Sequence, residues 1–272
     1  MIIEKHVSME LSKEKIWSTI EMEAEQAARN EPGLSALLEE KILQHSGLKD
    51  AVVHEIIKRL SLSKNAMFTK SFEFIDAIHK SLIEENIILD LTAIVDRDSA
   101  CNLFCTPLLF YKGFLSLQIY RIANILWASN HQISALLLQT FISEHFAVDI
   151  HPKAKIGIGV MLDHATGIVI GETAVVEDNV SIMQSVTLGG TGKNSGDRHP
   201  KIRRNVLLGP QSTILGNIEI GESSMVGAAS VVLDSVPPRS IVAGVPARKI
   251  GDVLNSWPSQ TMNQIFSSND ST

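Results

Sequence analysis

The stretch VDIHPKAKIGIGVMLDHATGIVIGETAVVEDNVSIMQSVTL, residues 148–188, decides the fold, because an aliphatic residue returns at almost every sixth position. A slip of two residues separates Ile168 from Ile170, and a longer interruption follows Leu188. A period of six matches neither the 3.6 of a helix nor the alternation of a strand, and it is typical of a parallel β-helix of hexapeptide repeats. The aliphatic positions are Ile150, Ile156, Leu162, Ile168, Ile170, Val176, Ile182, Leu188, Ile202, Leu208, Ile214, Ile220, Val226 and Val232.

The repeat predicts a triangular prism over residues 147–250. Each group of six residues forms one short side, its aliphatic residue points inward, and successive coils stack at the strand spacing of about 4.8 Å. The interior of such a prism is filled, so any chemistry must lie outside it, in grooves or on loops.

Residues 1–146 have a helical pattern instead. Apolar faces within charged segments predict helices over 10–30, 33–45, 49–61, 69–84, 107–128 and 131–146, with a polar break around Asp98. The fold class is therefore α+β: an all-helical N-terminal domain that serves assembly, followed by the β-helix. Residues 251–272 are rich in Ser and Asn, which predicts a flexible tail.

The composition excludes several classes of protein. The 272 residues carry a net charge of -6, which argues against a nucleic-acid partner because phosphate binding needs a basic surface. Cys101 and Cys105 match neither a CxxC motif nor a disulfide framework. The N-terminus lacks a signal-peptide pattern, and the most apolar run, residues 133–142, is too short to span a bilayer. We expect a soluble, cytoplasmic protein with no membrane association.

The segment TLGGTGKNSGDRHPKI, residues 187–202, interrupts the repeat and predicts an extruded loop. Such a loop costs the prism little, because loop-closure entropy grows slowly with length. Its glycines suggest a phosphate-binding P-loop, but that motif requires glycine where Thr187 stands and Ser or Thr where Asn194 stands. The loop must therefore serve another purpose.

Histidines and aspartates gather in three segments, VDIHP, LDHATG and DRHPK. Asp149 and His164 are 15 residues apart, which on an 18-residue coil places them near the same edge of adjacent coils. A carboxylate that orients an imidazole makes a general base, because histidine titrates near neutral pH. The alternative is that these residues occupy solvent-facing corners. A zinc site is not expected, since His151 and His164 are 13 apart and no HxxxxH pair exists.

The DHATG and GGTGK…GDRHPKI motifs, together with TPLLFYKGFLSLQIYRIANILW at 106–127, closely resemble bacterial and plant serine acetyltransferases. The resemblance spans roughly residues 10 to 265. It implies a left-handed β-helix and acetyl transfer from acetyl-CoA to the hydroxyl of L-serine, giving O-acetylserine as the first step of cysteine biosynthesis. It also implies a homotrimer or a dimer of trimers with active sites between neighbouring prisms, L-cysteine as an inhibitor, and no metal.

The same resemblance implies the roles of individual residues. His164 would be the general base, Asp149 its orienting partner, and His199 a further residue of the catalytic pocket. Asp98 and Asp163 would bind the ammonium group of serine, and Arg198 its carboxylate, because a guanidinium offers paired donors. The residues implied for acetyl-CoA are Gly189, Gly190, Thr191, Gly209, Ala228, Arg248 and Lys249.

Three positions depart from the family pattern. Pro210 has no N–H to offer to CoA, and Ser99 replaces a usual proline, which predicts a looser turn beside Asp98. The chain ends in Thr272 rather than the isoleucine that inserts into O-acetylserine sulfhydrylase, so that complex is not expected. Two alternatives stay open: acetyl transfer to another hydroxyl, such as that of homoserine or a sugar, and a non-catalytic trimeric scaffold.

Overall fold

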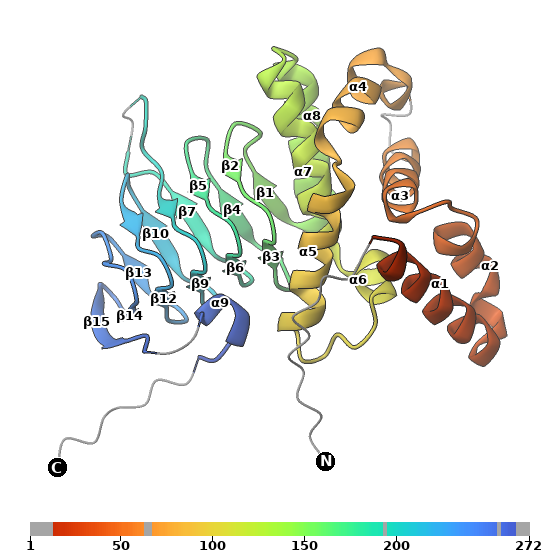
Figure 1. Ribbon diagram of the computed structural model, residues 1–272. Coiled ribbons are helices and arrows are strands. Elements are labelled where there is room, and N and C mark those ends of the chain that lie inside the picture. The colour runs from red at the N-terminus through yellow and green to blue at the C-terminus, as the bar shows by residue number, and fades with distance from the viewer. Residues whose placement is uncertain (1–12, 63–66, 193–194, 255–256, 265–272) are drawn as a thin grey trace, which may run out of the picture. The chain divides into compact units, whose positions relative to one another are not determined.

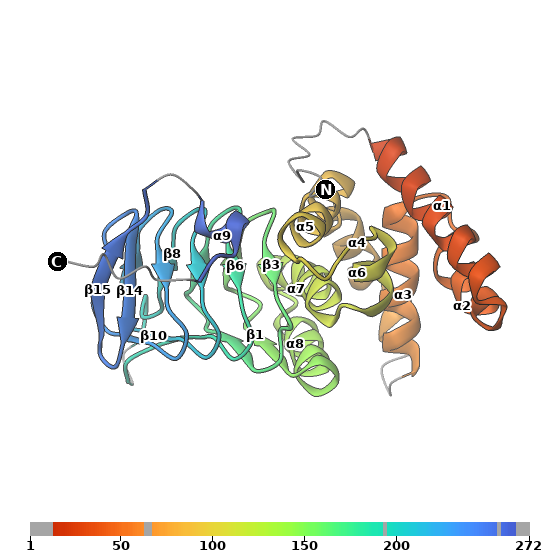
Figure 2. The same ribbon diagram turned by 90° about the horizontal axis from the view of Figure 1, so that it is seen from below.

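The computed structural model describes residues 13–62, 67–192, 195–254 and 257–264. The chain divides into two compact units, Met1–Val148 and Asp149–Thr272 (Figures 1 and 2). The first unit is helical and the second is built from short parallel strands. This confirms the predicted order of a helical region followed by a β-helix.

The helical unit contains helices of varied length. They are α1 (Lys13–Asn30), η1 (Pro32–Leu34), α2 (Ser35–Leu38), η2 (Glu39–Leu43), α3 (Leu48–Leu62), η3 (Phe68–Lys70), α4 (Phe72–Ser81), α5 (Glu84–Arg97), α6 (Cys105–Phe110), α7 (Lys112–Ala128) and α8 (Gln132–Phe146). Helix α7 is buried around most of its circumference, as expected for a central helix. Its buried Arg121 pairs with Asp90 of α5 at 2.7 Å, which satisfies both charges.

The structure differs from the prediction at two places in this unit, a break within a predicted helix and a helix, α5, that was not predicted. The prediction over 107–128 is wrong at Tyr111, which has extended backbone angles and separates α6 from α7. The prediction over 69–84 did not include α5, although Ile87, Leu91 and Ile94 are buried at helical spacing.

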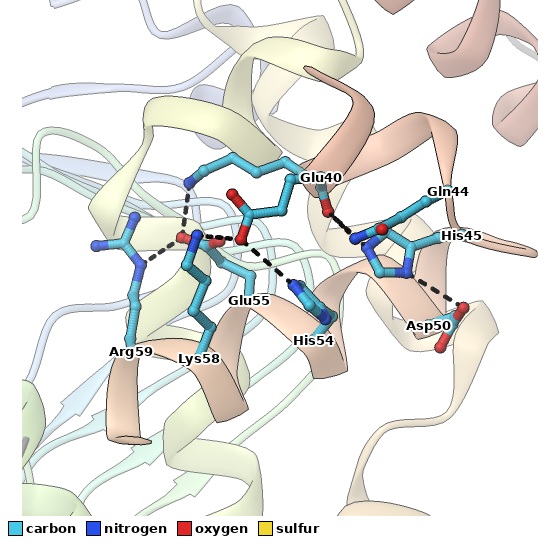
Figure 3. A network of polar contacts seen from close by, with 9 residues as sticks. Glu40, Gln44, His45, Asp50, His54, Glu55, Lys58 and Arg59 are labelled. Atoms are coloured by element: carbon cyan, nitrogen blue, oxygen red, sulfur yellow. Dashed lines mark hydrogen bonds and ion pairs between the residues drawn. The ribbon is translucent and has the colours of Figure 1, made fainter. Parts of the chain in front are cut away.

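A polar network joins η2 to α3 within this unit (Figure 3). The buried Glu55 accepts hydrogen bonds from Lys41 at 2.8 Å and from Arg59 at 2.5 Å. Burial raises the pKa of Glu55, but the bonds and charges of Lys41 and Arg59 outweigh that effect and leave the pKa below its ordinary value. Lys58 bonds to Glu40 in the same network.

The second unit is a parallel β-helix whose strands form three sheets. In sequence order the strands are β1 (Val148–Ile150), β2 (Lys155–Ile156), β3 (Met161–Leu162), β4 (Ile168–Ile170), β5 (Val175–Val176), β6 (Ser181–Ile182), β7 (Thr187–Gly189), β8 (Lys201–Ile202), β9 (Leu207–Leu208), β10 (Thr213–Leu215), β11 (Glu219–Ile220), β12 (Met225–Val226), β13 (Val231–Val232), β14 (Ser240–Gly244) and β15 (Ala247–Asp252). Strands three apart in sequence lie side by side, as in β1-β4-β7-β10-β13. This is the arrangement that the hexapeptide period predicts, and every aliphatic position of the repeat except the half-buried Ile156 is buried.

The strand register shows where the coil departs from regularity. Lys155 pairs with Val175, twenty residues later, and Val175 pairs with Lys201, twenty-six residues later. Lys201 then pairs with Glu219, eighteen residues later, which is the regular coil. The first coil therefore holds two extra residues and the second holds eight, at the slip and at the loop found in the sequence.

The last part of the chain closes the prism differently. Strand β15 pairs with β14 in the antiparallel direction, whereas the other named pairs are parallel. Helix α9 (Pro258–Thr261) follows and lies beside β6 and β9 (Figure 2), where the Ser181 hydroxyl donates to the Ser259 carbonyl at 2.8 Å. The predicted flexible tail thus includes a docked helix, and its end, residues 265–272, lies outside the described residues.

Candidate active site

His164 lies in the turn that the two extra residues of the first coil create. The turn connects β3 to β4, and both His164 and Ala165 have positive φ, at 54° and 61°. Ala165 is fully buried, whereas 73% of the His164 side chain is exposed. The next coil supports the turn, because the Ser185 N–H donates to the Thr166 carbonyl at 2.8 Å. The enlarged corner thus holds an imidazole out from the prism on a fixed backbone.

Two carboxylates lie near this turn: Asp163 precedes His164 in the sequence, and Asp149 lies on the neighbouring strand. Asp163 Oδ1 is 3.8 Å from Nε2 of His164, and only 14% of the Asp163 side chain is exposed. Asp149 is half-buried in β1, the strand next to β4. The expected 18-residue stacking of Asp149 and His164 is wrong in length, since this coil has twenty residues. Asp149 nevertheless lies in β1, the neighbour of β4, and β4 is the strand that follows the His164 turn.

His199 is buried at the point where the loop rejoins the β-helix, and Thr173 of the preceding coil contacts its ring. Its Nδ1 lies 2.8 Å from the Thr173 hydroxyl and 3.2 Å from the Thr173 N–H. The backbone N–H of Thr173 can only donate, so Nδ1 accepts it, while the Thr173 hydroxyl also accepts from the backbone N–H groups of Arg198 and His199. Nδ1 is therefore an acceptor, and the proton of the neutral ring lies on Nε2. Burial, with the charge of Arg198, lowers the pKa of His199 and favours this neutral form.

Arg198 belongs to an ion-pair cluster that connects the loop to the two preceding coils of the β-helix. Its guanidinium donates to Glu172 at 2.7 Å, and Lys153 donates to the other oxygen of Glu172 at 2.8 Å. The hydrogen bonds of Lys153 and Arg198 lower the pKa of Glu172 to about 2. Glu172 therefore stays ionised and orients Arg198, while the guanidinium keeps further donors for a ligand carboxylate.

Comparison with known proteins identifies the family. A family description, serine acetyltransferase, N-terminal, matches residues 16–119. The serine acetyltransferase of Salmonella typhimurium is 47% identical over 255 residues, covering 93% of each chain. The chain belongs to the serine acetyltransferase family. A serine acetyltransferase solved in complex with cysteine has a TM-score of 0.87 and 44% identity over 94% of this chain and 100% of its own. That of Brucella abortus in complex with coenzyme A has a TM-score of 0.83 and 46% identity, covering 89% and 97%.

The acetyl-CoA candidates of this family member occupy several places on the β-helix. Gly189 ends β7, and a Cβ at Gly190 would lie 3.3 Å from Cγ of Arg198, so the two ends of the loop meet there. Thr191 is exposed beside them. A Cβ at Gly209 would lie only 2.8 Å from the N of Ala228, so glycine is required for the packing of these coils.

The remaining acetyl-CoA candidates lie nearer the end of the prism. Ala228 is exposed. Pro210, which lacks an N–H, uses its carbonyl to accept from the Ala229 N–H at 2.8 Å. Arg248 and Lys249 are exposed on β15, and Lys249 pairs with Asp252 at 2.6 Å.

Asp98 belongs to the helical unit, where it caps the C-terminus of α5. Its Oδ1 accepts from the Ala100 N–H at 2.8 Å and its Oδ2 from the Tyr111 hydroxyl at 2.9 Å. The Cys101 N–H donates to the Asp98 carbonyl at 3.1 Å. These bonds close the turn even though Ser99 stands where proline was expected.

Sequence reasoning missed Thr173, Glu172, Lys153 and Tyr111. Thr173 and His199 are 26 residues apart, the length of the enlarged coil, so adding the loop to the regular period would have aligned them. No cluster of three or more His, Cys, Asp or Glu side chains suited to a metal occurs among the described residues. Within the same residues, no helix is both long and apolar enough to cross a membrane.

Proposed function

We propose that this chain transfers the acetyl group of acetyl-CoA to the hydroxyl of L-serine, giving O-acetyl-L-serine and CoA. The proposal rests mainly on the position of His164, whose exposed imidazole lies at an enlarged corner of the β-helix with the Asp163 carboxylate beside it. Relatives of high identity over nearly the whole chain are serine acetyltransferases, and solved members hold coenzyme A or cysteine. Coenzyme A is what remains of acetyl-CoA after the proposed reaction, and cysteine resembles serine, the proposed acceptor.

In the proposed mechanism His164 is the general base. It takes the proton of the serine hydroxyl as the oxygen attacks the thioester carbonyl, and the C–S bond then breaks as the carbonyl re-forms. The imidazolium returns its proton to the departing CoA sulfur, so the enzyme ends unchanged. Asp149, in the strand beside β4, would orient the ring.

The other candidates would hold the amino acid at both ends. Asp98 and Asp163 supply carboxylates for the ammonium group, and Arg198, oriented by Glu172, supplies the guanidinium for the carboxylate. His199 would face the pocket with an Nε2–H donor, because its Nδ1 accepts from Thr173. This set favours an α-amino acid over a sugar, which has neither charge.

For acetyl-CoA we propose backbone donors along Gly189, Gly190, Thr191, Gly209 and Ala228, with Arg248 and Lys249 meeting the phosphates. Pro210 cannot contribute an N–H to that path. The remaining features follow from the resemblance: residues 147–250 as the catalytic domain, a trimer or dimer of trimers, a cytoplasmic location and inhibition by L-cysteine. Cysteine has the same ammonium and carboxylate as serine, so the same residues would bind it in competition.

The experiment uses the purified protein with acetyl-CoA and separate hydroxyl acceptors, following the free thiol of CoA. We expect rapid release with L-serine, slow release with L-homoserine, none above background with a hexose, and relief of cysteine inhibition by added serine. Preference for homoserine or a hexose would replace the proposed acceptor. No acetyl transfer to any of them, with no acetyl-CoA binding, would leave the scaffold alternative.

A further inference from the structure

Tyr111, a residue to which the sequence assigned no role, donates a hydrogen bond to the carboxylate of Asp98. Its hydroxyl lies 2.9 Å from Oδ2 of Asp98, and an ionised carboxylate can only accept, so the hydroxyl is the donor. The other oxygen, Oδ1, accepts from the Ala100 N–H at 2.8 Å. Each oxygen of Asp98 therefore has one fixed partner, and the plane of the carboxylate is determined.

The backbone of Tyr111 is itself held at a junction between helices. Its N–H donates to the carbonyl of Pro107 in α6, and its carbonyl accepts from the N–H of Leu115 in the first turn of α7. Burial, and then the contact with Asp98, raises the pKa of Tyr111 above its ordinary value. The hydroxyl therefore keeps its proton throughout the physiological range and remains a donor.

We propose that Tyr111 is a positioning residue for the amino-acid substrate, holding the Asp98 carboxylate in the orientation in which it accepts the substrate ammonium group. This inference rests on the proposed function, because it deepens the role assigned there to Asp98. A carboxylate has about four lone-pair sites, and the two bonds described here leave acceptor capacity on both oxygens. Asp98 is only half-buried, so a ligand can approach it.

The expected effect of losing the hydroxyl follows from this geometry. Tyr111→Phe keeps the ring, but Oδ2 of Asp98 loses its donor and the carboxylate can rotate. Substrate binding must then restrict that rotation. We expect the KM for serine to rise by roughly 5- to 30-fold, since bonds to charged groups are among the stronger ones, while kcat and the KM for acetyl-CoA change little.

The test compares Tyr111→Phe, Asp98→Asn and the double variant in steady-state kinetics with serine and acetyl-CoA. Ser116→Ala is the matched control, because it removes a hydroxyl from α7, the helix that follows Tyr111, and that hydroxyl donates to the Lys112 carbonyl. Melting temperatures are measured for all four. We expect a raised KM for serine in Tyr111→Phe, an unchanged KM in Ser116→Ala, and no further rise when Tyr111→Phe is added to Asp98→Asn.

The possible failures are separable. A wild-type protein that does not acetylate serine contradicts the proposed function itself. An active wild type whose Asp98→Asn variant binds serine normally removes Asp98 from the substrate site, and the inference fails with it. A raised KM in Asp98→Asn without one in Tyr111→Phe, or additive effects in the double variant, overturns the role of Tyr111 alone.

Discussion

At the scale of single residues, the site depends on a backbone conformation that most side chains avoid. Single residues with positive φ recur at corners of the β-helix, as at Asn179 and Asn205, but His164 and Ala165 adopt it in succession, at an energetic cost for non-glycine residues. The buried Ala165 methyl and the bond from Ser185 hold the turn from inside and from the next coil. The packing of the turn, rather than contacts of the imidazole ring itself, therefore holds His164 at the surface.

We expect His164→Asn to lower kcat by about 10²–10⁴-fold, the usual cost of losing a general base, and asparagine tolerates a left-handed backbone. Folding should be preserved. Asp149→Asn should be milder because it disturbs orientation without deleting the base. Stopped assays of CoA release with saturating serine measure the effect, and circular dichroism checks the fold. Near-normal turnover by His164→Asn would remove it from the mechanism.

Thr173 offers a second test at this scale. Its hydroxyl joins three groups of the returning loop, namely two backbone N–H donors and Nδ1 of His199. Thr173→Val keeps the shape but loses all three bonds, so we expect kcat/KM for serine to fall by about tenfold or more, at a stability cost of about 1–3 kcal/mol. Thr173→Ser retains the hydroxyl and should stay near wild type. Equal kinetics for the valine and serine variants would contradict this account.

At the scale of elements, the network between η2 and α3 makes the helical unit sensitive to acid (Figure 3). The bond from Lys58 lowers the pKa of Glu40, the backbone bond from Ser46 lowers that of Asp50, and Glu55 has a lowered pKa despite its burial. A lowered folded-state pKa stabilises the protein above the unfolded value, about 4 for a carboxyl, and this is lost as pH falls through the folded value. Stability should therefore fall below about pH 4.5.

Glu55→Gln tests this acid sensitivity directly. It leaves Lys41 and Arg59 without their shared carboxylate, so the variant should lose about 1–3 kcal/mol at pH 7 and show a shallower decline toward pH 3. Helical circular dichroism during heating, from pH 7 to pH 3, measures both effects. Glu31→Gln, at an exposed carboxyl, is the control and should follow the wild type. Parallel acid curves for Glu55→Gln and wild type would show that Glu55 does not contribute.

The sequence predicted elements well where one period dominates and poorly where the tertiary context decides. The six-residue repeat located the prism, the two-residue slip and the loop, because each inward position must be aliphatic. Nothing local in LLFYKG marks the break at Tyr111, and its contact with Asp98 spans 13 residues. The cluster of Lys153, Glu172 and Arg198 likewise depends on the register of coils of unequal length. His164 and Asp163, adjacent in sequence, needed no such register.

At the scale of the whole molecule, the resemblance implies that a C-terminal isoleucine inserts into O-acetylserine sulfhydrylase, and this can be tested at residue 272. Residue 272, outside the described residues, is threonine, whose side chain is small and polar where the family pattern has isoleucine. Burial of an Ile side chain contributes about 1.5–3 kcal/mol, or roughly one to two decades of affinity. For the polypeptide of residues 1–272 we expect a weak complex or none with O-acetylserine sulfhydrylase, and a clear gain for Thr272→Ile. Thr272→Val is an intermediate control, and calorimetric titration measures all three. Tight binding by the wild type would disprove this.

The antiparallel strand β15 has a consequence for solubility. An open strand edge is a template for intermolecular pairing, and charged side chains on such an edge discourage aggregation. β15 ends its sheet and exposes Arg248 and Lys249, the residues proposed for the CoA phosphates. Replacing both by serine should therefore raise the KM for acetyl-CoA and also speed the growth of light scattering on storage, whereas replacing the exposed Arg204, away from this edge, should do neither. One pair of cations would serve ligand capture and colloidal stability together.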